Sequence, residues 1–159
     1  MTAEMLTAVR NALADDVELV SWCVEKFGQP PTIQIDFDEE DAIDADSYPF
    51  IGILAVAHHT AINAPEQGWT IPMLAAVRKT GVTVSSASLD IGAEKAVSVP
   101  LRTYEGRGLA ETLREKALAA IFRGRIGKIT VSGDDMSHTY HPRFFSPFTI
   151  NVTTQQQRR

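Results

Sequence analysis

Apolar residues recur at helical spacing in the stretch from Gly106 to Phe122. One side of this predicted helix collects Leu109, Ala110, Leu113, Ala117, Ala120 and Ile121. The segment Gly106-Arg107-Gly108 in front of it is typical of a turn, and Gly124 behind it is expected to end the helix in a left-handed conformation. Isolated helices of this length are marginal in water, so this one needs a surface to pack against.

Two shorter helical patterns lie at the amino terminus. The first covers residues 2–14, with its apolar side formed by Met5, Leu6, Val9, Ala12 and Leu13. Asp16 is the expected cap of the second, in which Val17, Val20, Val24 and Phe27 align. Gly28 and the prolines that follow it are expected to end this helix.

Most of the remaining apolar segments alternate or run continuously as strands do. Predicted strands cover residues 32–37, 49–58, 69–77, 82–89, 96–101, 128–132 and 148–153. Residues 49–58 are apolar on both faces, as in a central strand, whereas Pro72 indicates an edge strand or a bulge in 69–77. The two predicted strands on either side of the turn Asp90-Ile91-Gly92 are rich in serine and have few apolar side chains to bury. Residues 82–101 are therefore expected to form a projecting hairpin arm.

This order of elements favours the α+β class. We expect one domain over residues 1–159, with a mostly antiparallel sheet and the long helix packed across it. The amino-terminal helices would lie beside that helix, and residues 155–159 would be a frayed tail. A sheet of this kind leaves exposed edges that must be covered or used for association.

Length and composition suit an intracellular domain with a sizeable core. The chain has 159 residues, of which 44% are hydrophobic. Its single cysteine, Cys23, excludes an internal disulfide and is expected to be a small buried apolar residue, not a nucleophile. The early Glu4 argues against a signal peptide, and the longest apolar run, 50–57, is too short to span a bilayer.

Charge is distributed unevenly between the two parts of the chain. Residues 1–100 carry 5 basic and 15 acidic side chains, whereas residues 101–159 carry 10 basic and 5 acidic ones. Seven of the eleven residues 36–46 are acidic. Their spacing does not fit an EF-hand, because Asp41 stands where glycine is needed and Ser47 where glutamate is needed. The segment is therefore interpreted as a solvated loop, with an acidic contact patch for a basic partner as the alternative.

Candidate chemistry is sparse. His58 and His59 are adjacent on a predicted strand and should point to opposite faces, and His138 and His141 are expected in a loop. No Gly-x-Ser-x-Gly turn occurs, and Gly106-Arg107-Gly108 lacks the lysine and hydroxyl of a phosphate loop. We expect no catalytic residue, cofactor or metal, although a metal-binding module or metal-dependent enzyme using the four histidines is the alternative hypothesis.

Nucleic-acid binding is not expected to be specific. Basic residues that could form a stripe are Arg123, Arg125, Lys128, Arg143, Arg158 and Arg159. The net charge of −5 and the lack of aromatic residues between these basic residues argue against specific nucleic-acid binding.

Four segments spread over the chain share the features of one family. They are the opening helix 2–14, the acidic loop leading into Tyr48-Pro49-Phe50-Ile51-Gly52-Ile53, the segment Tyr104-Glu105-Gly106 leading into the helix 109–122, and the closing strand Phe145-Ser146-Pro147-Phe148-Thr149-Ile150-Asn151-Val152. Together they resemble the tail terminator (tail completion) proteins of long-tailed bacteriophages and prophages. The resemblance implies a non-enzymatic virion protein with a sheet flanked by helices. Such proteins form a hexameric ring that caps the tail tube below the head.

The same resemblance implies partners and a location. The chain would bind copies of itself, the tail-tube protein and head-completion or connector proteins, and would assemble into the tail in the cytoplasm of a bacterial host. A ring needs contacts between two different patches of neighbouring copies. We expect the acidic residues Asp38, Glu39, Glu40 and Asp41 of one copy to face Arg123, Arg125 or Arg143 of the next. A non-viral α+β binding module is the remaining alternative.

Overall fold

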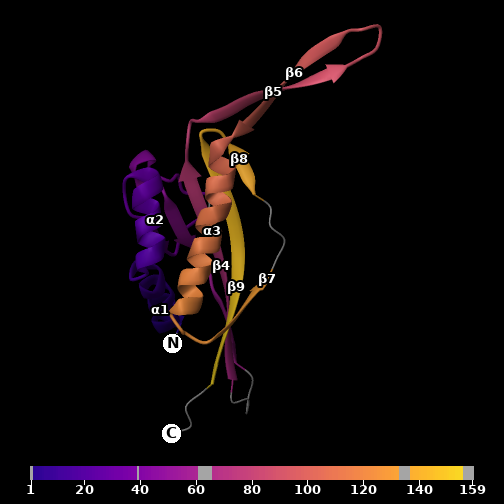
Figure 1. The fold of residues 1–159 in the computed structure, drawn as a ribbon. Coiled ribbons are helices and arrows are strands. Elements are labelled where there is room, and N and C mark those ends of the chain that lie inside the picture. The colour runs from indigo at the N-terminus through magenta and orange to yellow at the C-terminus, as the bar shows by residue number, and fades with distance from the viewer. Residues whose placement is uncertain (1, 39, 61–65, 133–136, 156–159) are drawn as a thin grey trace.

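The computed structural model describes residues 2–38, 40–60, 66–132 and 137–155, and it has the predicted α+β architecture (Figure 1). A mixed sheet has the order β1-β2-β4-β9-β7, and the short strands β3 and β8 pair with β4 and β9. The strands are β1 (Thr32–Ile35), β2 (Phe50–Ile53), β3 (Ala57–Thr60), β4 (Glu66–Arg78), β7 (Lys128–Ser132), β8 (His138–Tyr140) and β9 (Arg143–Gln155). Within this sheet β1 pairs parallel with β2, and the other pairings are antiparallel.

Helices α1 (Thr2–Ala14), α2 (Val17–Phe27) and α3 (Glu105–Arg123) cover one face of the sheet (Figure 1). β4 and β9 pair along their whole length of 13 residues and form the centre of the sheet. Alternate residues of these strands, such as Ile71, Met73 and Ile150, are buried beneath the helices. None of the helices in the described part of the chain has the length and apolarity that crossing a bilayer requires.

The long helix forms as predicted and Gly124 caps it, but the turn expected at Gly106 and the left-handed conformation expected at Gly124 are wrong. Gly106 lies in the first turn of α3 instead of in a loop. A side chain at this position would meet the ring of Phe144, because an ideal Cβ would lie 2.1 Å from its Cδ2 atom. Gly124 has a φ of −68° and is not left-handed. It lies against Ala12 of α1, whose Cβ is 2.5 Å from where a Gly124 side chain would begin. Both glycines therefore permit close packing of a helix.

Helices α1 and α2 occupy the predicted residues. Asp16 accepts a hydrogen bond from the Leu19 amide, and Gly28 ends α2 with a φ of 78°. The predicted buried side of α2 is wrong, since Val17 is 77% exposed and Val24 is 46% exposed. Leu19 and Cys23 are buried instead. The α2 sequence offers two apolar stripes, and packing against α3 and the sheet selects the one that carries these two residues.

The strand predicted over residues 49–58 is divided into β2 and β3. β2 and β3 both pair with β4. In the gap between these two pairings, the segment that joins β2 to β3 has three residues and β4 has only two, which is a β-bulge. The Leu54 amide donates to the Pro72 carbonyl at 2.9 Å, but Pro72 has no N–H to return the second bond of the pair. Pro72 thus marks the bulge, as one predicted alternative had it, whereas the alternative of an edge strand is wrong because β4 is central.

The loop predicted around His138 is also wrong, since His138 to Tyr140 form β8 and pair with β9. β9 itself begins at Arg143, well before the predicted strand 148–153. Phe144, Ser146 and Phe148 face the helices, whereas Phe145 packs on the opposite face with Leu74 and Tyr48. The alternation of β9 therefore supplies side chains to both faces of the sheet.

Candidate functional site

A two-stranded hairpin projects from the body and is the most exposed part of the described chain. It consists of β5 (Val82–Asp90) and β6 (Ala96–Tyr104), which form a sheet of their own, and each of their residues is exposed. Figure 1 shows this arm extending away from the main sheet at the end that carries β8. Isolated two-stranded hairpins are marginally stable in water, so a partner surface would stabilise the arm.

The two faces of the arm differ in polarity. Opposed residues share a face, and one face carries the pairs Leu89–Val97, Ala87–Val99 and Ser85–Leu101. The other face carries Ser88–Ser98 and Ser86–Pro100 in its outer part. Leu89 is 54% exposed and Leu101 is 46% exposed. The arm thus presents an apolar face that its own chain leaves uncovered.

The root of the arm is fixed to the body by aromatic rings. Tyr104, the last residue of β6, stacks on His141 with ring centroids 4.6 Å apart and lies 5.8 Å from the Phe144 ring. The Lys79 amide also donates to the Pro142 carbonyl at 2.8 Å. These contacts tie the strand that enters the arm, and the helix that follows it, to the start of β9.

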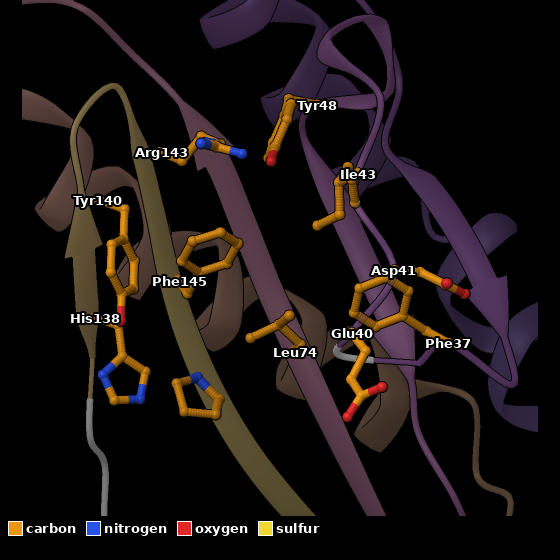
Figure 2. Close-up of a pocket in the computed structure, with 12 residues that line it drawn as sticks. Phe37, Glu40, Asp41, Ile43, Tyr48, Leu74, His138, Tyr140, Arg143 and Phe145 are labelled. Carbon is orange, nitrogen blue, oxygen red and sulfur yellow. The ribbon is translucent and has the colours of Figure 1, made fainter.

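A groove of about 510 Å³ lies on the face of the sheet opposite the helices (Figure 2). We call it the acidic-loop groove. Its floor is Leu74, Phe145 and Pro147 from β4 and β9. One wall comes from the loop before β2 and consists of Phe37, Glu40, Asp41, Ala42, Ile43 and Tyr48. The other wall consists of His138, Tyr140 and Arg143 from the β8–β9 hairpin. An apolar floor between an acidic and a basic wall is suited to a peptide segment that carries both kinds of charge.

Tyr48 has an unused hydrogen-bond donor at one end of this groove. The residue is only 5% exposed, and its buried hydroxyl has no acceptor for its proton among the residues that the structure describes. Figure 2 shows the Arg143 guanidinium pointing toward it, but a guanidinium has no acceptor for the hydroxyl proton. Burial raises the pKa of Tyr48, whereas the positive charge of Arg143 and a hydrogen bond donated by its guanidinium act in the opposite direction. A buried donor without an acceptor costs free energy, and a docked segment with a carbonyl or hydroxyl oxygen would satisfy it.

The predicted interface residues fall at two separate places. Glu40, Asp41 and Arg143 line the acidic-loop groove, whereas Arg123 lies at the end of α3. Asp38 lies in the same acidic loop, where its carboxylate accepts from the Glu40 amide at 3.0 Å, and Glu39 lies outside the described residues. Arg125 is exposed and follows α3 with a φ of 51°. Whether these groups meet between copies stays a prediction.

Arg123 already has acidic partners within its own chain. Its Nε and Nη2 atoms bind the Asp16 carboxylate at 2.7 and 2.8 Å, and its Nη1 atom lies 3.1 Å from Glu18. Replacing Arg123 by Glu would therefore break an ion pair inside the monomer. Arg125→Glu is the cleaner test of the predicted charge contact, because Arg125 forms no ion pair with the described residues of its own chain. Salt-dependent weakening of self-association would support that contact.

Asp16→Ala is expected to lower the free energy of unfolding by about 1–2 kcal/mol, because it removes the cap of α2 together with the Arg123 pair. Asp16→Asn keeps a capping oxygen and should cost less. The hydrogen bond from Arg123 lowers the pKa of Asp16 in the folded state. This contribution is therefore present above the unfolded pKa of about 3.9 and is lost as pH falls through the folded pKa. Urea unfolding of the three proteins at neutral and acidic pH measures it, and an Asn variant as acid-sensitive as the wild type would contradict it.

The histidines lie at opposite ends of the sheet. His58 pairs with Trp69 across β3–β4 and stacks on its ring at 4.8 Å, whereas His138 pairs with Phe145, the partner of Ala76. These points are seven positions apart along β4, from Trp69 to Ala76, which corresponds to roughly 24 Å. The described residues contain no group of three His, Cys, Asp or Glu side chains placed to hold a metal ion. The geometry therefore does not bring the four histidines together as the alternative hypothesis needs.

Cys23 is fully buried in the core, as predicted. Burial raises the pKa of its thiol to about 12, which keeps the sulfur protonated and unreactive near neutral pH. The residues that sequence reasoning missed are Tyr48 and Phe145 as parts of a site. Their adjacency depends on the register between β2, β4 and β9, for which the sequence has no local signal.

The fold and these two surfaces define an α+β protein with a projecting hairpin arm and a groove on its open sheet face. The sequence matches no protein-family model, and no curated protein matches it at a significant level.

Proposed function

We propose that this chain is a virion structural protein of a phage or prophage that terminates tail-tube growth and joins the tail to the head. In this role the chain acts through contacts and not through turnover. The resemblance of the sequence to tail terminator proteins suggests the role, and the arm is the observation that supports it most. An apolar hairpin face left uncovered by its own chain is expected in a subunit that is completed by assembly.

The proposed assembly is a ring, hexameric as in the family that the sequence resembles. The arm and the acidic-loop groove are different surfaces of one chain, and contacts between different surfaces close into rings or extend into filaments. The strands β1 and β7 form the two ends of the strand order. Their open edges are available for the tail-tube protein and for head-completion or connector proteins.

Electron microscopy of tails assembled with and without this chain tests the proposal. Without it, tails of uncontrolled length that fail to attach heads are expected, because nothing would stop tube growth or offer a surface to the head. Adding the purified chain should restore a uniform length. Tails of normal length that join heads in its absence would refute the role and leave a non-viral binding module as the explanation of the arm.

A further inference from the structure

We propose that the β5–β6 arm of one copy seats its apolar face in the acidic-loop groove of a second copy. This contact specifies how the subunits of the proposed ring are joined, and in that sense it rests on the proposed function. It also stands as a statement about self-association that can be tested on the purified chain alone.

The geometry excludes the arm's own groove as its docking site. Arg143, at one end of the groove, is two residues from His141, on which the root of the arm stacks. Each strand of the arm has nine residues, so the tip lies about 30 Å beyond the root. Figure 1 shows the arm pointing away from the body. Only another molecule can therefore bring a tip and a groove together.

The outer half of the arm matches the groove in polarity. Leu89 and Val97 form the apolar pair nearest the tip, and they would lie on the floor made by Leu74, Phe145 and Pro147. The groove volume of about 510 Å³ is large enough to admit several side chains. The serine-bearing face of the arm would stay directed toward solvent, as its polarity requires.

The charges are complementary as well. The exposed tip of the arm carries Asp90, Glu94 and Lys95 within six residues. The groove has Glu40 and Asp41 on one wall and Arg143 on the other, so each sign at the tip finds the opposite sign on a wall (Figure 2). A tip of one sign would be repelled by one of the two walls, whereas this mixed tip is accepted by both.

Tyr48 provides the polar anchor of the contact. Among the described residues, its buried hydroxyl proton has no acceptor. A hairpin in the groove would bring main-chain carbonyls, which can accept that proton. Tyr48→Phe is therefore expected to leave the fold intact and to weaken association, because the proposed contact supplies the acceptor for the hydroxyl proton that this substitution removes.

Val97→Glu tests the arm, and Ser98→Glu is its matched control. The two substitutions place the same charge on neighbouring residues of the same strand, on opposite faces of the hairpin. Analytical ultracentrifugation over a range of concentrations should show association of Val97→Glu weakened by about tenfold or more, with Ser98→Glu close to wild type. The arm lies outside the core, so both variants should unfold at the wild-type temperature, and Leu89→Glu on the opposing strand repeats the test.

Ala42→Trp tests the groove, and Ala45→Trp is its matched control. Both alanines are exposed in the segment before β2, where Ala45 begins the short 3-10 helix η1 (Ala45–Ser47), but only Ala42 lines the groove. The indole at position 42 should block docking and leave folding unchanged. The decisive experiment mixes Val97→Glu with Ala42→Trp protein. Ala42→Trp protein keeps an intact arm, and Val97→Glu protein keeps an intact groove. The arm of the first should bind the groove of the second and give a dimer that grows no further.

The outcomes separate this contact from the proposed function. Wild-type association that survives Val97→Glu and Ala42→Trp, or a mixture that yields no dimer, would overturn the arm–groove contact and leave the tail role standing. A wild-type chain that is monomeric at every concentration would also overturn the contact. A dimer in the mixture, combined with tails of normal length in the absence of the chain, would support the contact and reject the tail role.

Discussion

Phe144→Ala is expected to lower the free energy of unfolding by about 3–5 kcal/mol, more than any other substitution considered for this protein. Phe144 is 1% exposed and lies at the start of β9, beneath the first turn of α3. Its ring also contacts Tyr104 and His141 at the root of the arm. The truncation would leave a cavity between helix and sheet, and the glycine above it offers no side chain to fill that space.

Phe145→Ala is the matched control for this prediction. It removes the same side chain from the next residue of β9, but Phe145 is only partly buried and packs on the opposite face of the sheet. A loss of about 1–2 kcal/mol is expected, together with weaker self-association because the groove loses part of its floor. Urea unfolding measures both values. Equal losses for the two variants would contradict the assignment of Phe144 to the main core.

Gly106→Ala is expected to destabilise the protein by about 1–3 kcal/mol, although alanine normally favours a helix. The reason is the close approach of α3 to β9. An ideal Cβ at position 106 would lie 2.1 Å from Cδ2 and 2.2 Å from Cε2 of the buried Phe144 ring, so either the ring or the helix must move. The strain falls on the first turn of α3, directly after the arm.

Gly108→Ala is the control for the helix propensity itself. It lies in the same part of α3, and an added Cβ there meets nothing within 4 Å. This variant should be about 0.5–1 kcal/mol more stable than the wild type. In a Phe144→Ala background the clash at position 106 is removed, so Gly106→Ala should then become neutral or stabilising. A double-mutant cycle without such coupling would show that the two residues do not determine the helix–sheet distance.

The contact between Gly106 and Phe144 affects assembly as well as stability. The close approach of Gly106 to Phe144 sets the distance between α3 and the sheet. Tyr104, at the root of the arm, contacts both His141 and Phe144, so the position of the arm depends on the same packing. A shift at this point would change the direction in which the arm leaves the body. We therefore expect Gly106→Ala to weaken self-association beyond what its loss of stability explains.

Local patterns were sufficient to predict most of the elements. The period of 3.6 residues in α1 and α3 and the alternation in β9 are repeated several times, and repetition makes these signals robust. The serines at 85, 86 and 88 correctly indicated a hairpin with little to bury. The prediction for Gly28 is confirmed, but the turn predicted at Gly106 is wrong, because a glycine in a turn and a glycine under an aromatic ring look the same in sequence.

The candidate site could not be predicted to the same degree. The acidic loop was recognised as a charged segment, but its opposite wall comes from residues about 100 positions later in the chain. Arg123 shows the same limit, since its carboxylate partner Asp16 is 107 positions away. Charge patterns indicate which side chains need partners, and they do not indicate which partners the fold supplies.

The sequence by itself determined the helices, the arm and the α+β class, because these depend on the spacing of apolar residues within short segments. Only the tertiary structure decided the burial of one stripe of α2, the bulge opposite Pro72 and the groove between the acidic loop and the β8–β9 hairpin. Each of these depends on strand register or on contacts between distant segments. Such contacts are selected by the packing of the whole core. The sequence of a single segment carries no information about which distant segments it will pack against.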